Sequence, residues 1–228
     1  MSSILIVESK NDKYFIEALI RHMNVIDVEV SDGYICDIDD YECMNGSDGK
    51  IIVASLKTVS NIINKNNEIN KVGIIIDLDN KTKQERLELI NISINEAFGT
   101  ANVLDDINSI KMVTLNKNQK INIAAYFTNV DNRGELETVL KKIKSSSSTY
   151  ADCLQSWHDC LVAKNGNGLS VKDFNKFWVS IYTRYDNCLG TDKKQAGTKC
   201  NNQASMSKAI WNFDHNCLDD LKTFLKLF

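Results

Sequence analysis

The chain has 228 residues, of which 43% are hydrophobic and 25% are charged, a composition ordinary for a globular protein with a buried core. The formal charge of −3 excludes a protein-wide positive field, so any binding of nucleic acid depends on local basic patches. No apolar run reaches the roughly 20 residues that span a bilayer, and residues 1–8 lack the basic start of a signal peptide. We therefore expect a cytoplasmic protein without a membrane-spanning segment.

Apolar runs and amphipathic stripes alternate along the first part of the chain, which predicts an α/β fold with a mostly parallel sheet flanked by helices. Glu8 follows the first expected strand, and Asp12 is the expected N-cap of the first helix. Residues 31–50 predict a solvated loop, with a second metal-binding loop as the alternative. The expected strands are residues 3–7, 25–30, 51–54, 72–76, 111–115 and 121–127, the last two forming a hairpin, and the expected helices are residues 13–23, 56–64 and 82–98.

The apolar run at residues 72–76 ends abruptly in the carboxylates of Asp77 and Asp79. Its length and its β-branched residues predict a strand buried on both faces, which belongs in a parallel sheet. Ligand sites in such sheets lie just beyond the carboxyl ends of the strands. On an extended backbone, residues two apart point the same way, so these two carboxylates are expected to share a divalent cation such as Mg²⁺. The alternative is an acidic turn exposed to solvent.

After residue 150 the pattern changes to helical stripes alone. The polar run at residues 145–149 is the expected seam between a core of residues 1–144 and a mainly helical C-terminal lobe of residues 150–228. The aromatic stripe of the lobe is interpreted as core. The helices expected in the lobe are residues 151–163, 171–185 and 218–228.

The seven cysteines are widely spaced and include no C-x-x-C pair. In a chain of this length, an odd number of scattered cysteines predicts reduced thiols and argues against a disulfide framework. The alternative is a zinc site, although the spacing of its ligands fits no compact zinc motif. Those ligands would be Cys188, Cys200, His215 and Cys217.

Two polar stretches have both a structural and a functional interpretation. Glu135 and Glu137 begin an expected helix, where carboxylates suit the helix dipole without any chemistry. The only clear basic cluster lies further on and is either part of a solvated loop or a contact for phosphate groups. Its members are Arg184, Lys193, Lys194, Lys199 and Lys208.

Three acidic motifs carry a resemblance to a known family. They are V-E-S-K-N-D at residues 7–12, D-L-D at residues 77–79 and G-E-L-E at residues 134–137, and W-N-F-D at residues 211–214 adds to them. Together they resemble the TOPRIM domain, the Mg²⁺-binding α/β module of topoisomerases, primases and OLD-type nucleases. The chain is most similar to a bacterial TOPRIM-like family of small proteins, from which it departs at Ser9, where that family usually has glycine.

The resemblance implies a role for each matched acidic residue. Glu8 is implied as the general acid/base and as a metal ligand. Asp77 and Asp79 are implied as ligands of Mg²⁺ or Mn²⁺. Glu137 is implied as the residue that completes the metal shell, which agrees with the need of phosphodiester cleavage for an activated water and for neutralised charge at phosphorus.

The resemblance also sets the expected function, a metal-dependent nuclease or related phosphodiester-processing enzyme that serves defence against foreign DNA. Lys10 and Lys194 are the expected contacts for phosphate or nucleic acid, although Lys194 matches no motif. The alternatives are a non-catalytic TOPRIM-like module that binds a nucleotide or nucleic acid, and a structural partner subunit. No G-x-x-x-x-G-K-[ST] motif occurs, so an ATPase partner would be a separate chain, and a homo-oligomer stays open.

Overall fold

The computed structural model describes residues 2–31, 49–66, 69–101, 103–115 and 119–228. The chain forms two compact units, of which the first contains Met1–Thr128 and Asp219–Phe228 and the second contains Asn129–Leu218. This division differs from the expected core of residues 1–144 and lobe of residues 150–228, because the C-terminal helix packs within the first unit.

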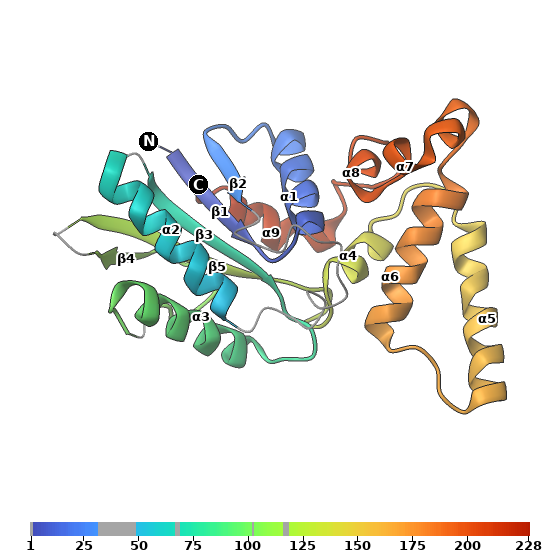
Figure 1. Cartoon of the computed structure of the whole chain (residues 1–228), viewed down its shortest axis with the longest axis horizontal. Coiled ribbons are helices and arrows are strands. Elements are labelled where there is room, and N and C mark those ends of the chain that lie inside the picture. Colours follow the sequence, from blue (N-terminus) through green and yellow to red (C-terminus); the bar gives the residue numbers. More distant parts are fainter. Residues whose placement is uncertain (1, 32–48, 67–68, 102, 116–118) are drawn as a thin grey trace. The chain divides into compact units, whose positions relative to one another are not determined.

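A five-stranded sheet forms the centre of the first unit (Figure 1). The strands are β1 (Ser2–Val7), β2 (Val28–Ser31), β3 (Ile69–Asp77), β4 (Lys111–Thr114) and β5 (Lys120–Thr128). Their spatial order is β2-β1-β3-β5-β4, and only β4 runs antiparallel to its neighbour. The predicted α/β fold, a mostly parallel sheet flanked by helices with a helical C-terminal region, is confirmed. The carboxyl ends of the four parallel strands therefore share one edge of the sheet.

One face of the sheet is covered by α2 (Lys50–Asn66) and α3 (Lys83–Phe98), which pack against each other. Alternate strand residues, among them Ile6, Ile74 and Ile123, join both helices in one buried hydrophobic cluster. Because successive side chains of a strand point to opposite faces, this alternation leaves the intervening residues for the other side of the sheet.

The other face of the sheet is covered near its centre by α9 (Asp219–Leu225), which also contacts α1 (Lys10–Met23). The ring of Phe224 on α9 lies 5.6 Å from the ring of Tyr126 on β5, centroid to centroid. The last ten residues of the chain thus complete the core of the first unit although they are distant from it in sequence.

Several expected elements occur close to the predicted residues. Strands β4 and β5 pair antiparallel, as the hairpin predicted for residues 111–115 and 121–127 requires. Helix α3 begins after Thr82, which forms a capping box with Glu85, and it ends at Gly99 in the left-handed region.

Two expectations near the start of the chain are wrong. Residues 51–54 belong to helix α2 and not to a strand, since Ile52, Leu56 and Val59 recur at helical spacing and are buried together. A short apolar run cannot by itself separate these two structures. Helix α1 starts three residues before the expected start at residue 13, and Ser9 is its N-cap in place of Asp12. The loop expected at residues 31–50 falls mostly outside the described residues.

The second unit is helical, and its aromatic stripe forms the core only in part, because Phe177 and Tyr185 of that stripe are exposed. Trp178 and Tyr182 are buried and stacked with ring centroids 5.0 Å apart, and Trp211 lies 5.0 Å from Tyr182. No helix in the described part of the chain is long and apolar enough to cross a membrane. The main helices of this unit are α4 (Leu136–Lys142), α5 (Thr149–Asn165), α6 (Val171–Ile181), the π-helix η3 (Tyr182–Asp186), the 3-10 helix η4 (Gly190–Gln195), α7 (Ala196–Lys199) and α8 (Asn202–Ser205).

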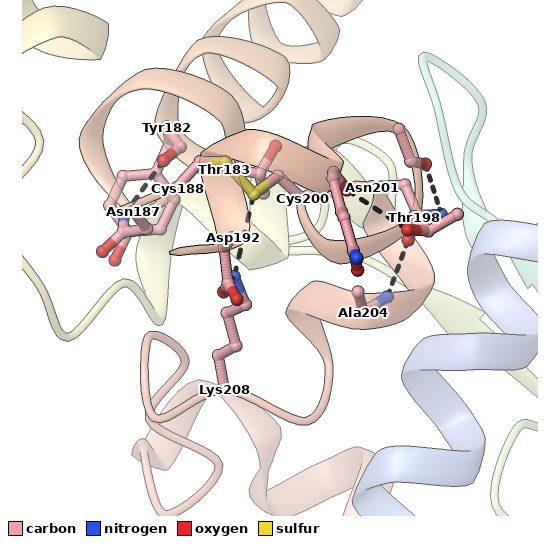
Figure 2. The surroundings of a disulfide bond; sticks show 12 residues. Tyr182, Thr183, Asn187, Cys188, Asp192, Thr198, Cys200, Asn201, Ala204 and Lys208 are labelled. Atoms are coloured by element: carbon pink, nitrogen blue, oxygen red, sulfur yellow. Dashed lines mark hydrogen bonds and ion pairs between the residues drawn. A yellow bond between two sulfur atoms is a disulfide. The ribbon is translucent and has the colours of Figure 1, made fainter. Parts of the chain in front are cut away.

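Cys188 and Cys200 form a disulfide in the second unit (Figure 2). The prediction of reduced thiols is therefore wrong for this pair, because the helix and turn between them bring two buried sulfurs together across a sequence separation of 12. The alternative zinc site is wrong as well, since both of its first two ligands are consumed by the disulfide. Cys153 and Cys160 are free thiols exposed to solvent.

Gly73 lies in the central strand β3 at a position where a side chain has no room. A Cβ atom added there would lie 2.4 Å from Leu5 Cδ2 and 2.8 Å from Phe228 Cζ. We expect Gly73→Ala to lower the free energy of unfolding by about 1–3 kcal/mol, because both side chains must shift within a filled core. Urea denaturation measures this loss. The control is Gly197→Ala, whose added Cβ meets nothing within 4 Å, and equal stability of the two variants would contradict the prediction.

Candidate functional site

Glu8 lies in the short turn between β1 and α1. Strand β1 ends at Val7 and helix α1 begins at Lys10, so the position of Glu8 is fixed from both sides. Ser9 is the N-cap of α1: its Oγ accepts a hydrogen bond from the Asp12 amide nitrogen at 3.2 Å and donates one to Asp12 Oδ2 at 2.5 Å. The hydroxyl of Ser9 therefore has a capping role that glycine at this position would not supply.

Asp77 is the last residue of β3 and lies beside Glu8 at the same edge of the sheet. Its backbone N–H donates a hydrogen bond to Glu8 Oε2 at 2.9 Å, across 69 residues of sequence. This contact follows from the pairing of β1 with β3, in which Val7 lies opposite Ile75. Asp77 is 9% exposed, whereas Glu8 is partly open to solvent. Two of the acidic residues singled out in the sequence are thus neighbours in space.

The connections of the sheet change direction at this same point. From β1 the chain passes through α1 to β2 on one side, and it then passes through α2 to β3 on the other side of β1. In open α/β sheets, such a switch point leaves a crevice beyond the strand ends where ligands bind. Glu8 and Asp77 therefore occupy the position at which this fold is expected to bind a ligand.

Asp79 follows a different course from the one expected. The strand ends at Asp77 and Asp79 has φ +53°, so the extended backbone that would align the two side chains does not continue to Asp79. Its Oδ2 lies 2.5 Å from Nη2 of Arg86 on α3 in an ion pair that is mostly buried. The loop is also tied to β5 by a hydrogen bond from Leu78 N to Thr128 O at 3.0 Å. Asp79 therefore lies at the same edge of the sheet as Glu8 and Asp77, and its charge is matched by an arginine. We call this region, with Glu8, Asp77 and Asp79, the acidic edge.

Arg86 also belongs to this region, although the sequence analysis did not single it out. It is 8% exposed, and its Nε makes no hydrogen bond with any residue that the structure describes. A signal was present in the sequence, because Arg86 stands four residues before Ile90 on the buried stripe of α3. A charged side chain on a buried stripe requires a partner, and Asp79 is the acidic residue at the end of the preceding strand.

Glu135 and Glu137 belong to the second unit and begin α4, as the helix-dipole interpretation expects. Glu135 is 4% exposed, and its Oε1 accepts hydrogen bonds from Thr138 Oγ1 at 3.1 Å and from Asn175 Nδ2 at 3.3 Å. Burial raises the pKa of Glu137, while the charge of Lys176 opposes that shift.

The two expected phosphate contacts lie in different units. Lys10 is exposed in the first turn of α1, immediately after the Glu8 turn. Its charge is added to the positive end of the dipole of a 14-residue helix. Lys194 is exposed on η4 in the second unit.

The acidic edge provides the kind of oxygen ligands that Mg²⁺ prefers. Among the described residues, no group of three or more His, Cys, Asp or Glu side chains is arranged to hold a metal ion. Mg²⁺ is often held by only one or two carboxylates and completes its shell with water and substrate phosphates. Glu8 and Asp77 fit that requirement, and Asp79 is a third donor that Arg86 engages. The larger shell that would include Glu137 stays a prediction.

These observations define an α/β protein with a candidate ligand site at the carboxyl edge of a mostly parallel sheet. A family model described as "Protein of unknown function (DUF3226)" matches residues 2–228, and the chain belongs to this family. Searches of curated proteins and of solved structures gave no match. The TOPRIM resemblance and the roles it implies therefore stay predictions.

Proposed function

We propose that the chain is a divalent-cation-dependent enzyme that processes phosphodiester bonds of nucleic acid, with Glu8 and Asp77 at the centre of its site. One observation carries the proposal, the hydrogen bond from Asp77 N to Glu8 Oε2 at 2.9 Å. It brings two acidic residues from distant segments to the switch point of the sheet, where a ligand site is expected. The proposal includes the cytoplasmic location and the role against foreign DNA that the sequence leads us to expect.

Each residue of the edge has a defined task in this proposal. Glu8 and Asp77 hold Mg²⁺ or Mn²⁺, which would supply an activated water and neutralise charge on the phosphate. The Glu8 carboxylate, positioned by the Asp77 N–H, accepts the proton of the attacking water. Lys10 and the N-terminus of α1 attract the phosphate oxygens of the substrate.

Cation binding is the first test of the proposal. We expect Mn²⁺ to bind the wild-type protein in isothermal titration calorimetry and to bind Glu8→Gln and Asp77→Asn at least tenfold more weakly. Both substitutions keep the shape of the side chain but remove a charged oxygen ligand. Glu88→Gln is the matched control, since Glu88 is an exposed carboxylate on α3. Unchanged Mn²⁺ binding by both site variants, or no binding by the wild type, would overturn the proposal.

A non-catalytic module that binds a nucleotide or nucleic acid is the second candidate. The ion pair between Arg86 and Asp79 favours it, because the arginine neutralises one of the three carboxylates of the edge. An arginine guanidinium is also a common partner of phosphate groups. The two candidates differ in one result: the module binds oligonucleotides in the presence of Mn²⁺ without cleaving them.

A further inference from the structure

The second unit carries a dense positive charge on a chain that is acidic as a whole. Residues 184–208 contain five lysine and arginine side chains and two aspartates, whereas the formal charge of the whole chain is −3. Both aspartates are occupied within the unit. The carboxylate of Asp186 accepts hydrogen bonds from Tyr150 N at 2.8 Å and Ala151 N at 3.0 Å, and Asp192 forms an ion pair with Lys208 at 2.7 Å.

Four cations of this segment remain exposed. Arg184, Lys193, Lys194 and Lys199 form no ion pair or side-chain hydrogen bond with any residue that the structure describes. We call them the free cations. Cations that are exposed and unpaired can each contact a phosphate group without breaking an existing interaction.

The segment that carries three of these cations is closed by the disulfide (Figure 2). Cys188 is 1% exposed and Cys200 is fully buried, so both ends of the segment are fixed inside the unit. Lys208 donates to Asp192 Oδ2 at 2.7 Å and approaches Cys200 Sγ at 3.9 Å, which ties the middle of the segment to its end. A segment held in this way loses little conformational entropy when it binds a partner.

Two exposed aromatic rings, one of them next to Arg184 in sequence, lie at the start of the basic segment. Tyr185 directly follows Arg184 and is 57% exposed, and Tyr150 is 63% exposed. Their ring centroids are 6.4 Å apart. Asp186 holds this pair together, because its carboxylate caps the start of α5 at Tyr150. Tyrosine rings that are open to solvent offer faces on which unpaired bases can stack.

We propose that the disulfide-closed segment, the free cations and the Tyr150–Tyr185 pair form a binding surface for single-stranded nucleic acid. This inference rests on the proposed function, since it names the form of nucleic acid that the protein recognises. Phosphates of the strand contact the free cations and its bases stack on the tyrosines. A duplex keeps its bases paired and stacked, and an acidic peptide carries charge without flat bases, so neither partner uses both features of the surface.

The test is fluorescence anisotropy with labelled thymidine and uridine oligonucleotides of about 16 nucleotides, a length that one binding fold can cover. EDTA removes divalent cations, so cation-dependent binding at the acidic edge does not contribute to the measured affinity. A lack of oligonucleotide binding in this assay is therefore distinct from a lack of Mn²⁺ binding in the calorimetric titration. With three or four phosphate contacts, log K against log salt is expected to have a slope of about −2 to −3 between about 50 and 200 mM salt.

Two variants distinguish the contribution of the free cations to the affinity from that of the tyrosine rings. Lys193→Gln/Lys194→Gln/Lys199→Gln is expected to weaken binding at least tenfold and to reduce the magnitude of the salt slope by about 2. Tyr185→Ala is expected to weaken binding about tenfold and to leave the slope unchanged, because stacking involves no counterion. The matched control replaces three exposed lysines elsewhere and should stay within about twofold of wild type. It is Lys65→Gln/Lys120→Gln/Lys164→Gln.

Several outcomes would overturn this inference. They are no binding by the wild type, an equal loss in the control triple variant, and binding of a duplex as tightly as a single strand with no effect of Tyr185→Ala. Competition by polyglutamate at equal charge concentration would identify a general polyanion surface and would overturn it as well.

Discussion

Glu8→Gln is expected to slow cation-dependent cleavage of nucleic acid by about 10²- to 10⁴-fold, the usual contribution of a general acid or base. Glutamine retains an oxygen that can accept the hydrogen bond from Asp77 N, which is 2.9 Å long in the wild type. It cannot accept the proton of an attacking water at neutral pH, so the variant separates proton transfer from local structure. Single-turnover cleavage of a labelled oligonucleotide with saturating Mn²⁺ measures the chemical step directly.

The control for this variant must show that the fold is intact. The thermal unfolding midpoint of Glu8→Gln in EDTA is expected to match that of the wild type, and Glu88→Gln is expected to cleave at the wild-type rate. Cleavage by Glu8→Gln at the wild-type rate would mean that Glu8 does not act as the general base. A wild-type protein that binds Mn²⁺ and oligonucleotide but cleaves neither DNA nor RNA would favour the non-catalytic module.

The features of the fold that the sequence predicts are those with local signals. Helix α3 has a capping box at Thr82 and Glu85, an amphipathic stripe and a terminal glycine, and each signal lies within a few residues of the element it defines. The central strand also has a local signal, an apolar run rich in β-branched residues that ends sharply at Asp77. The same kind of run at residues 51–54 is misleading, since only the later residues of α2 show that the buried positions have helical spacing.

The arrangement of the candidate site depends on contacts that no local signal contains. The neighbourhood of Glu8 and Asp77 requires the strand order, in which β3 pairs with β1 and not with β2. The disulfide requires Cys188 and Cys200 to meet across η4 and α7. The left-handed backbone of Asp79 removes the simple alternation from which a shared direction of the two aspartates was expected. Residue identity and spacing thus indicate the candidates, whereas tertiary structure decides which of them lie together.

The ion pair between Arg86 and Asp79 allows a sharp test of whether the edge binds a cation. The two charges are 2.5 Å apart with side-chain exposures of 9% and 18%. Arg86→Leu is expected to lower the free energy of unfolding by about 3 kcal/mol in EDTA, because it removes the positive charge beside the Asp79 carboxylate in a poorly solvated place. The double variant Arg86→Leu/Asp79→Asn is expected to lose less stability, since it removes both charges of the ion pair.

A divalent cation at the edge would replace the missing positive charge of Arg86. We therefore expect Mn²⁺ to raise the unfolding midpoint of Arg86→Leu more than that of the wild type. At a Mn²⁺ concentration 100 times the dissociation constant, binding adds about 2.7 kcal/mol to the free energy of unfolding of the variant. The double variant should lack this extra gain, and Arg21→Leu, at an exposed position of α1, should respond like the wild type. Differential scanning fluorimetry over a Mn²⁺ series gives all four responses. An equal response of Arg86→Leu and wild type would mean that Asp79 takes no part in binding a cation.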